Sequence, residues 1–309
     1  MSQIIDDVPE SFDGTWNFHP KFNHSSGFKM HYIDEGTGPE TLLLLHGEPT
    51  WSYLFRQQIT EWSKHYRVIA VDHMGFGKSD TPQDRTYWLQ DHIDNLERFV
   101  LNLKLSNLTL VMHDFGGPVG MGFTIRHPPL VKRLISINAP LPAGQPDLAK
   151  QLISNASHSP WFQWILKAND EGILKQVLRQ LDYNILSTLK LNGFERNEII
   201  SDSWIRAYAS PFQNYDDCLG AIGWAEGFAA NEHRFEAPDE YTKRLISEKQ
   251  ALTIWGEKDK TLDSGIFLGL FRQIFPQGKT HVLPDVGHYS PEDAPDIISQ
   301  LVVDFIDKE

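Results

Sequence analysis

The residues of this chain with the clearest chemical meaning lie where a short apolar run meets an aspartate. Residues 111–117 (VMHDFGG) have the pattern of a buried strand that turns sharply into a helix, with Asp114 at the turn. Such a turn pushes its apex side chain out above the sheet, and small neighbours let the helix pack closely. A carboxylate there can displace a leaving group from a saturated carbon, giving an ester that water must hydrolyse. The simpler alternative is that Asp114 only caps the following helix.

Three further segments could supply partners for such a nucleophile. Residues 46–51 (HGEPTW) follow a buried strand, and a backbone N–H after the His-Gly pair could join that of Phe115 in an oxyanion hole. Asp259 follows a later strand and could orient a histidine, while His288 follows the last strand and could act as the base. Each has a plainer reading as a turn, a surface charge or a solvent histidine. Together they stand in the order nucleophile, acid, histidine, which is typical of the α/β-hydrolase fold.

The rest of the chain alternates short apolar runs with helical patterns, as expected for a mostly parallel sheet that is flanked by helices. Strands are predicted at residues 29–33, 41–45, 67–71, 108–112, 134–138, 251–255 and 280–283. Helices are predicted at residues 53–64, 88–103, 117–127, 264–275 and 291–306. In the last helix, the spacing of Ile297, Leu301 and Phe305 indicates the buried face.

The alternation stops after residues 138–142 (NAPLP) and resumes near residue 251. The intervening chain is helical in pattern and rich in aromatic residues, which favours a helical cap over the carboxyl ends of the strands, where such sheets bind ligands. A separate helical domain is the alternative. We predict an α/β-hydrolase core of residues 1–141 and 225–309, with residues 142–224 as the inserted cap.

Composition excludes several other classes of protein. The chain has 309 residues, 40% of them hydrophobic, which suits one large domain with an insertion. A net charge of −13 without a basic run argues against a nucleic-acid surface. Residues 1–14 do not resemble a signal sequence, and no apolar stretch approaches the roughly 20 residues of a membrane helix. We therefore expect a cytoplasmic protein that binds neither nucleic acid nor membrane.

Cysteine and histidine give no sign of a metal centre. The single cysteine, Cys218, can form no internal disulfide, and its surroundings in the sequence do not mark it as a nucleophile. The 13 histidines show no HExxH pattern and no ligand spacing with cysteine, so no metal is expected.

Several motifs resemble those of haloalkane dehalogenases. They are residues 46–56 (HGEPTWSYLFR), 72–80 (DHMGFGKSD), 113–117 (HDFGG), 207–212 (AYASPF) and 256–260 (GEKDK). The likeness spans most of the chain and is weakest in the middle of the cap. The shorter motifs are shared with epoxide hydrolases and with β-lactone-cleaving relatives, so they indicate an aspartate nucleophile more firmly than a substrate.

The resemblance implies a two-step hydrolysis of a small apolar substrate without a cofactor. Asp114 would displace halide and form an ester, and His288, held by Asp259, would activate the water that cleaves it. Glu48 would help to position that water. The backbone N–H groups of Glu48 and Phe115 would stabilise the oxyanion of the second step.

One position departs from the dehalogenase pattern. These enzymes usually carry tryptophan directly after the nucleophile, where its indole N–H binds the halide, but this chain has Phe115, which has no such donor. The Glu48 carboxylate is expected to repel a halide. The donor would therefore have to be a cap tryptophan, with Trp164 preferred over Trp161, although hydrophobic packing in a helix is the better explanation for either residue taken alone.

Three alternatives remain open at this stage. An epoxide hydrolase would use the same triad and protonate the leaving oxygen with cap tyrosines, for which Tyr183, Tyr208 and Tyr215 are available. An enzyme similar to β-lactone decarboxylases is the second alternative. The third is a non-catalytic protein on the same fold that binds a small ligand, against which the presence of all three triad candidates argues.

Overall fold

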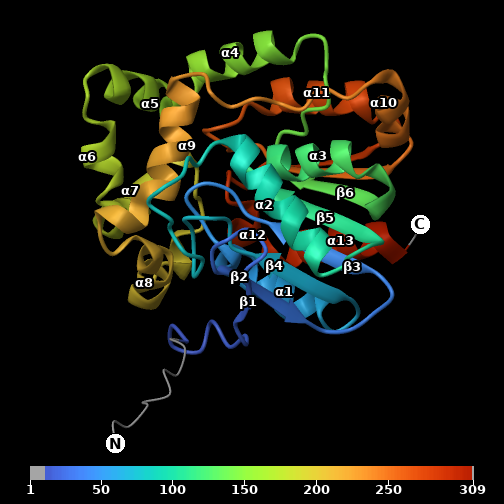
Figure 1. Cartoon of the computed structure of the whole chain (residues 1–309), viewed down its shortest axis with the longest axis horizontal. Helices are drawn as coiled ribbons and strands as arrows, with labels where there is room; N and C mark the ends of the chain where they lie inside the picture. Colours follow the sequence, from blue (N-terminus) through green and yellow to red (C-terminus); the bar gives the residue numbers. More distant parts are fainter. Residues whose placement is uncertain (1–10, 308–309) are drawn as a thin grey trace, which may run out of the picture.

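A single eight-stranded sheet forms the centre of the molecule (Figure 1). The computed structural model describes residues 11–307, so the expectation for residues 1–10 lies outside the described part. The strands are β1 (Lys21–Asn23), β2 (Met30–Glu35), β3 (Thr41–Leu45), β4 (Arg67–Val71), β5 (Leu108–His113), β6 (Val131–Ile137), β7 (Gln250–Gly256) and β8 (Lys279–Leu283). Their order is β1-β2-β4-β3-β5-β6-β7-β8, and from β4 to β8 every pair is parallel.

The two central strands bring the first sequence motifs together. All residues of β3 and β5 are buried, as expected for continuous apolar runs covered on both faces. Their parallel register pairs Leu45 with Met112, so both strands end at the same edge of the sheet. The turn after β3 therefore lies beside the turn that carries Asp114.

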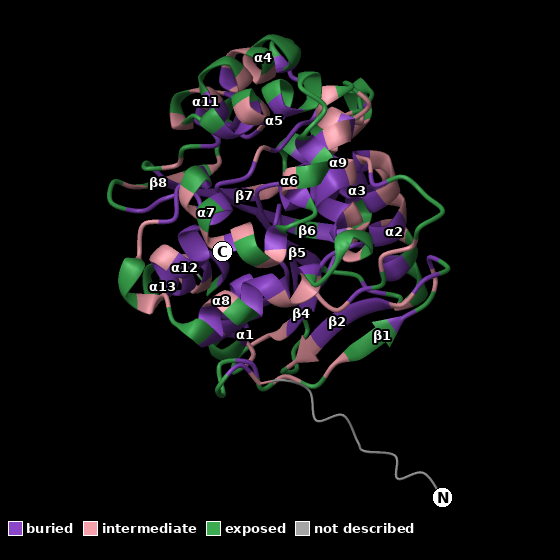
Figure 2. Cartoon of the chain, turned by 90° about the vertical axis from the view of Figure 1, so that its left-hand side faces the viewer, coloured by how far each residue is buried: buried purple, intermediate pink, exposed green. Residues whose placement is uncertain are grey.

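Helices cover both faces of this sheet. Figure 2 shows α2 and α3 on one side and α1, α12 and α13 on the other. The helices that accompany the sheet are α1 (Arg56–Trp62), α2 (Leu89–Asn102), α3 (Gly116–Arg126), α10 (Glu240–Ser247), α11 (Ser264–Ile274), α12 (Ser290–Asp293) and α13 (Pro295–Asp307). None of the helices within residues 11–307 combines the length and apolar composition that crossing a membrane requires.

The predicted strands are confirmed to within a few residues, and the differences have local causes. Strand β1 was not predicted, because it is short and two of its three residues are exposed. The helix expected over residues 53–64 starts as a 3₁₀ turn before α1. The buried face predicted for the last helix is wrong in part: Ile297 is 51% exposed, whereas Ile298 and Val302 are fully buried. Helix α13 packs against α1, and Ile298 and Val302 lie on the buried face of α13.

Between β6 and β7 the chain forms helices and no strand within residues 138–249. Figure 1 shows most of them grouped at one end of the sheet. They are α4 (Leu148–His158), α5 (Pro160–Asp170), α6 (Leu174–Leu178), α7 (Leu181–Asn192), α8 (Asp202–Ala209) and α9 (Leu219–Ala229), followed by α10. The division between cap and core stays a prediction. Because α9 runs past residue 224, a boundary after residue 229 would keep that helix intact.

A buried aspartate holds the loops beneath the site. Asp72 follows β4, and its Oδ1 accepts a hydrogen bond from Ser52 N at 2.8 Å. Its Oδ2 accepts one from Lys78 N at 2.8 Å and lies 2.7 Å from His31 Nδ1. Gly77 has a φ of 58°, and a Cβ there would overlap the carboxylate. Asp72 thus fixes the turn after β3 and the turn after β4 at the same time.

Replacing Asp72 should therefore destabilise the whole fold. Asp72→Ala leaves two buried N–H donors and His31 without their acceptor, so the free energy of unfolding should fall by about 3–5 kcal/mol. Urea denaturation measures this loss. The control is Asp84→Ala, whose side chain is 79% exposed and should change stability by less than about 0.5 kcal/mol. Equal unfolding midpoints for Asp72→Ala and Asp84→Ala would contradict the stabilising role of Asp72.

The pH dependence of this contribution has a definite sign. Burial alone would raise the pKa of Asp72, but His31 and the backbone donors outweigh burial and lower the pKa to about 2. A depressed pKa in the folded state stabilises the protein above the unfolded value. The contribution of Asp72 should be present above about pH 4 and lost as the pH falls towards 2.

Candidate active site

Asp114 lies at a tight turn between β5 and α3. Its backbone is left-handed, with a φ of 50°, which is uncommon for a residue other than glycine. Close packing surrounds it: a Cβ at Gly47 would overlap the Asp114 side chain, and a Cβ at Gly116 would overlap the Leu45 carbonyl. The turn after β3 therefore packs directly against the Asp114 side chain.

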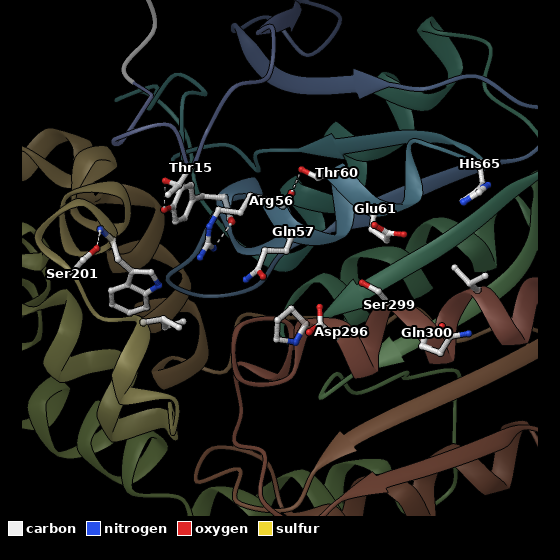
Figure 3. A pocket seen from close by; sticks show the side chains of 15 residues that line it. Thr15, Arg56, Gln57, Thr60, Glu61, His65, Ser201, Asp296, Ser299 and Gln300 are labelled. Atoms are coloured by element: carbon white, nitrogen blue, oxygen red, sulfur yellow. Dashed lines mark hydrogen bonds between the residues drawn. The ribbon is translucent and has the colours of Figure 1, made fainter.

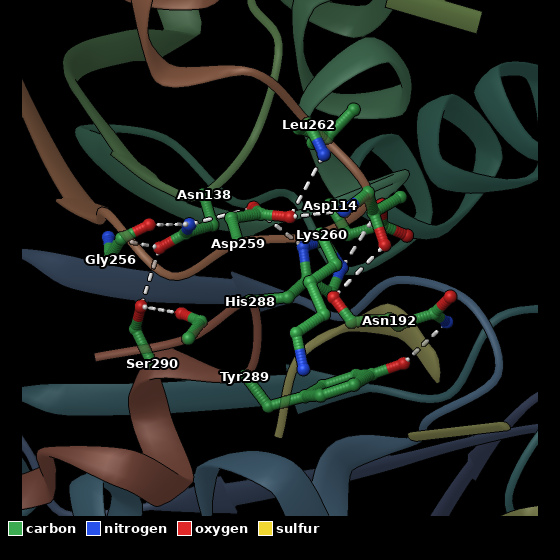
Figure 4. Close-up of polar contacts among 12 residues, drawn as sticks. Asp114, Asn138, Asn192, Gly256, Asp259, Lys260, Leu262, His288, Tyr289 and Ser290 are labelled. Atoms are coloured by element: carbon green, nitrogen blue, oxygen red, sulfur yellow. Dashed lines mark hydrogen bonds and ion pairs between the residues drawn. The ribbon is translucent and has the colours of Figure 1, made fainter. Parts of the chain in front are cut away.

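The structure brings the three predicted triad residues together (Figure 4). His288 Nε2 lies 3.5 Å from Asp114 Oδ2, and His288 Nδ1 lies 2.8 Å from Asp259 Oδ2. The imidazole is fully buried and the two carboxylates are nearly so. In this arrangement the histidine can exchange a proton on the side of Asp114 while Asp259 holds its other nitrogen.

Asp259 is held in place by a residue that sequence reasoning missed. Asn138, directly after β6, donates from Nδ2 to Asp259 Oδ2 at 2.8 Å. The other carboxylate oxygen accepts hydrogen bonds from Thr261 N at 2.7 Å and Leu262 N at 2.8 Å. Asn138 also receives a hydrogen bond from Gly256 N on its side-chain oxygen. The available signal was its position at the end of a central strand, next to a proline-rich turn.

At rest the site contains a buried ion pair. Burial alone would raise the pKa of Asp114, but the hydrogen bond and charge of His288 outweigh it and lower that pKa. Burial would lower the pKa of His288, yet Asp259 and Asp114 raise it to about 10. The imidazole therefore carries a proton near neutral pH as long as Asp114 is ionised. Conversion of Asp114 to a neutral ester would remove one of the charges that hold this proton.

Glu48 contacts Asp114 through its backbone, and its carboxyl group is buried. Its N–H donates to Asp114 Oδ1 at 2.8 Å, which is the geometry of an oxyanion-hole donor. Its side chain is buried, and Oε2 has no hydrogen-bond partner within residues 11–307. Burial and, next, the charge of Asp114 hold the pKa of Glu48 well above the usual glutamate value. A raised pKa favours the neutral acid, which would weaken the expected repulsion of a halide.

Phe115 lies in a group of nitrogen-bearing rings. The rings of His92, Trp224 and His233 have centroids 5.4, 5.6 and 5.9 Å from that of Phe115. The buried indole nitrogen of Trp224 has no hydrogen-bond partner among the described residues. Sequence reasoning did not find Trp224, because α9 has the pattern of a largely apolar helix. Among residues 11–307, no three histidine, cysteine or acidic side chains are grouped closely enough to hold a metal ion.

The two cap tryptophans chosen from the sequence lie elsewhere. Trp161 and Trp164 stack on each other in α5 with ring centroids 5.3 Å apart. They line a crevice of about 200 Å³ between α5, α6 and α7. The residue between them, Phe162, contacts Trp224, with ring centroids 6.2 Å apart. This placement favours packing as the role of Trp161 and Trp164.

The cap tyrosines are not directed at Asp114. Tyr208 is buried and donates its hydroxyl to Glu292, while Tyr183 and Tyr215 are 84% and 41% exposed. Tyr208 belongs to a cluster in which Arg56 and Trp204 also donate to Glu292. Arg56 and Trp204 also line a groove of about 870 Å³ between α1, α13 and the cap (Figure 3). None of the three triad residues lines this groove.

Comparison with known proteins agrees with the fold. Residues 40–295 match the family model of the alpha/beta hydrolase fold. The chain belongs to this family. It is 30% identical to a cis-3-alkyl-4-alkyloxetan-2-one decarboxylase of Shewanella oneidensis, over 94% of this chain and 88% of the relative.

Relatives with two other names cover the chain to a similar extent. A haloalkane dehalogenase of Psychrobacter cryohalolentis is 29% identical over 94% of this chain and 93% of its own length. Epoxide hydrolase 3 of Mus musculus is 28% identical over 91% of this chain and 75% of its own length. The resemblance to haloalkane dehalogenases noted from the motifs is therefore confirmed, with epoxide hydrolases as further relatives.

The coupling between Asp114 and His288 can be measured directly. Asp114→Asn removes one of the two carboxylates that hold the imidazolium, so the pKa of His288 should fall by roughly 1–3 pH units. Nuclear magnetic resonance titration of labelled histidine measures it. A suitable control is Asp263→Asn, which makes the same substitution at a carboxylate whose role is to cap α11. Asp263 accepts a hydrogen bond from Ile266 N. An unchanged His288 titration in Asp114→Asn would contradict the ion pair.

The same coupling predicts how stability varies with pH. Because the folded pKa of His288 is raised to about 10, its contribution to stability is present below about 6.5 and is lost as the pH rises through 10. Asp114→Asn should therefore flatten the stability profile over this alkaline range.

Proposed function

We propose that this chain is a hydrolase whose Asp114 attacks a saturated carbon bearing a leaving group, with haloalkanes as the substrate class. The observation that carries the proposal is the position of Asp114. Its Oδ1 accepts a hydrogen bond from Glu48 N at 2.8 Å, and its Oδ2 lies 3.5 Å from His288 Nε2. A buried carboxylate beside a histidine and a backbone donor is equipped for both formation and hydrolysis of an ester.

In the first step, Asp114 forms a bond to the carbon while the carbon–halogen bond breaks and halide leaves with the bonding electrons. The attacking carboxylate is buried, so it keeps little of the hydration that weakens a nucleophile in water. The negative charge moves from Asp114 to the halide. Because Phe115 has no polar hydrogen, we propose that Trp224, in contact with Phe115, donates its free indole N–H to the departing halide.

In the second step, water cleaves the Asp114 ester. Once Asp114 is a neutral ester, His288 loses one of the charges that raise its pKa and can give up its proton. As a neutral base it deprotonates a water molecule that attacks the ester carbonyl. The N–H of Glu48, together with that of Phe115, would stabilise the resulting oxyanion. Collapse releases the alcohol and restores the Asp114 carboxylate.

A second candidate function is the decarboxylation of a β-lactone, which the relative of Shewanella oneidensis favours. Asp114 would attack the saturated ring carbon that is bonded to the ring oxygen. The bond between this carbon and the ring oxygen would break, and the carboxylate formed in this way would stay attached to the substrate. That carboxylate would then leave as carbon dioxide, its electrons forming an alkene and expelling Asp114. This sequence uses no water, so it would not need His288 as a base. Epoxide opening has less support, because Tyr208 is engaged with Glu292.

The first test separates these functions by product. Wild-type protein should release bromide from short terminal bromoalkanes, and Asp114→Ala should release none. His288→Ala should still release one bromide per protein and then stop, because the ester cannot be hydrolysed. Intact-protein mass spectrometry should detect the alkyl group on Asp114.

The outcomes of this test are distinct. Bromide release that survives in Asp114→Ala would refute the nucleophile. Alkene and carbon dioxide from a β-lactone, formed at undiminished rate in His288→Ala, would favour the decarboxylase.

The proposed halide donor gives a second prediction. Trp224→Phe keeps an aromatic ring but removes the N–H, so the displacement step should slow by about tenfold or more. The loss should be larger for chloroalkanes than for iodoalkanes, because the poorer leaving group needs more stabilisation. Trp164→Phe is the matched control and should leave single-turnover halide release unchanged. Equal rates of single-turnover halide release in Trp224→Phe and Trp164→Phe would contradict the role of Trp224 as the halide donor.

A further inference from the structure

The end of cap helix α7 meets the loops that carry the triad. The helix ends at Asn192, and Gly193 follows with a φ of 112°. A Cβ on Gly193 would lie 3.0 Å from Lys258 O and from Lys260 N, and 3.4 Å from His288 N. Both the positive φ and the lack of space require glycine. We call Asn192 and Gly193 the cap elbow.

The cap elbow holds the loop that carries the acid. The Asn192 carbonyl accepts hydrogen bonds from Lys260 N and from Thr261 Oγ1, both at 3.2 Å. Thr261 in turn donates its N–H to Asp259 Oδ1 at 2.7 Å. The last carbonyl groups of a helix need partners outside the helix. Here the partners come from the loop that fixes Asp259.

The cap elbow also holds the backbone of the histidine. His288 N donates to Gly193 O at 2.8 Å, while His288 O lies 2.9 Å from His113 Nε2 in β5. One side of the His288 main chain is thus bound to the cap and the other to the core. A displacement of the cap elbow would move the peptide on which the imidazole is mounted.

The Asn192 side chain reaches the imidazole through a tyrosine. Asn192 Nδ2 donates to Tyr289 Oη at 3.0 Å (Figure 4). This hydroxyl donates in turn to Glu48 O at 3.4 Å. The Tyr289 ring packs edge-on against the His288 imidazole, with ring centroids 4.9 Å apart and planes at 83°. Asn192 and Tyr289 are each almost fully buried. A fixed tyrosine ring limits the rotation of the imidazole beside it.

We propose that Asn192 is a positioning residue: through Tyr289 it keeps His288 aligned for hydrolysis of the ester, so the cap takes part in the second step. This inference rests on the proposed function. The displacement step needs the Asp114 carboxylate, whereas only the hydrolysis step needs an aligned imidazole. Loss of the Asn192 side chain should therefore affect the two steps unequally, which general destabilisation would not do.

Single-turnover kinetics test this separation. Asn192→Ala removes the hydrogen bond to Tyr289 and keeps both backbone bonds of the cap elbow. With a bromoalkane, rapid quenching and mass spectrometry follow the formation and decay of the ester on Asp114. Formation should stay within about twofold of wild type, while decay should slow by roughly tenfold or more, since small misplacements of a catalytic group are costly.

The chain offers a matched control on the same helix. Asn184 is a half-buried asparagine of α7 whose Nδ2 donates to Val177 O at 3.4 Å, within the cap. Asn184→Ala should leave ester formation and decay unchanged. Tyr289→Phe should slow decay as Asn192→Ala does, and the double variant should be no slower than the slower single variant. Additive losses would mean that Asn192 does not act through Tyr289.

A measurement without substrate keeps this inference distinct from the proposed function. The Nδ1 proton of His288 that faces Asp259 can be observed by nuclear magnetic resonance in the resting protein, and its exchange with water should be faster in Asn192→Ala. If wild-type protein forms no ester with any haloalkane, the proposed function fails, and this exchange rate alone decides the positioning role. Unchanged exchange, or equal slowing of formation and decay, would overturn the inference.

Discussion

Two buried carboxylates share one histidine in this protein, and much of the surrounding structure serves that arrangement. Burial opposes charge on Asp114 and on His288, and these two charges persist because the opposite charges beside them compensate for burial. Compensation by charge alone is insufficient, since each remaining lone pair needs a donor. Glu48 N supplies one for Asp114, and backbone donors after Asp259 supply others. The turns of the core are therefore shaped by the need to present N–H groups to buried oxygens.

This balance of charge also explains how one histidine could serve a two-step reaction. While Asp114 is ionised, the raised pKa of His288 keeps it protonated and unable to act as a base. In the proposed reaction, ester formation would neutralise Asp114 and weaken the hold on that proton, so the base would become available when it is needed. The Glu48 side chain fits the same logic, because burial next to Asp114 favours its neutral acid. A second fixed negative charge beside the nucleophile would oppose the negative charge that develops on a departing anionic group.

The cap differs from a simple lid in how closely it is joined to the reacting residues. A lid would contact the core at its rim, whereas Gly193 accepts a hydrogen bond from the main chain of His288 itself. Trp224, from another cap helix, contacts the residue after the nucleophile. We assign the two contacts to different parts of the reaction: the Gly193 contact to the base, and the Trp224 contact to the leaving group. Under this assignment, a change in α9 would alter the contact with the leaving group, whereas a change at the end of α7 would alter the position of His288.

Local sequence determined the strands, the order of the triad residues and the turn at Asp114, because continuous apolar runs and closely packed glycines restrict the backbone on their own. Asp114, Asp259 and His288 could be identified for the same reason: each follows a strand, and parallel strands end at one edge. The partners of these residues could not be identified in this way. Trp224 lies in a largely apolar helix, Asn138 resembles any turn residue, and Asn192 ends a cap helix far from His288 in sequence. Whether these side chains meet Phe115, Asp259 or Tyr289 depends on how segments distant in sequence pack together, and only the tertiary structure decides that, since such packing places side chains through contacts that no local pattern records.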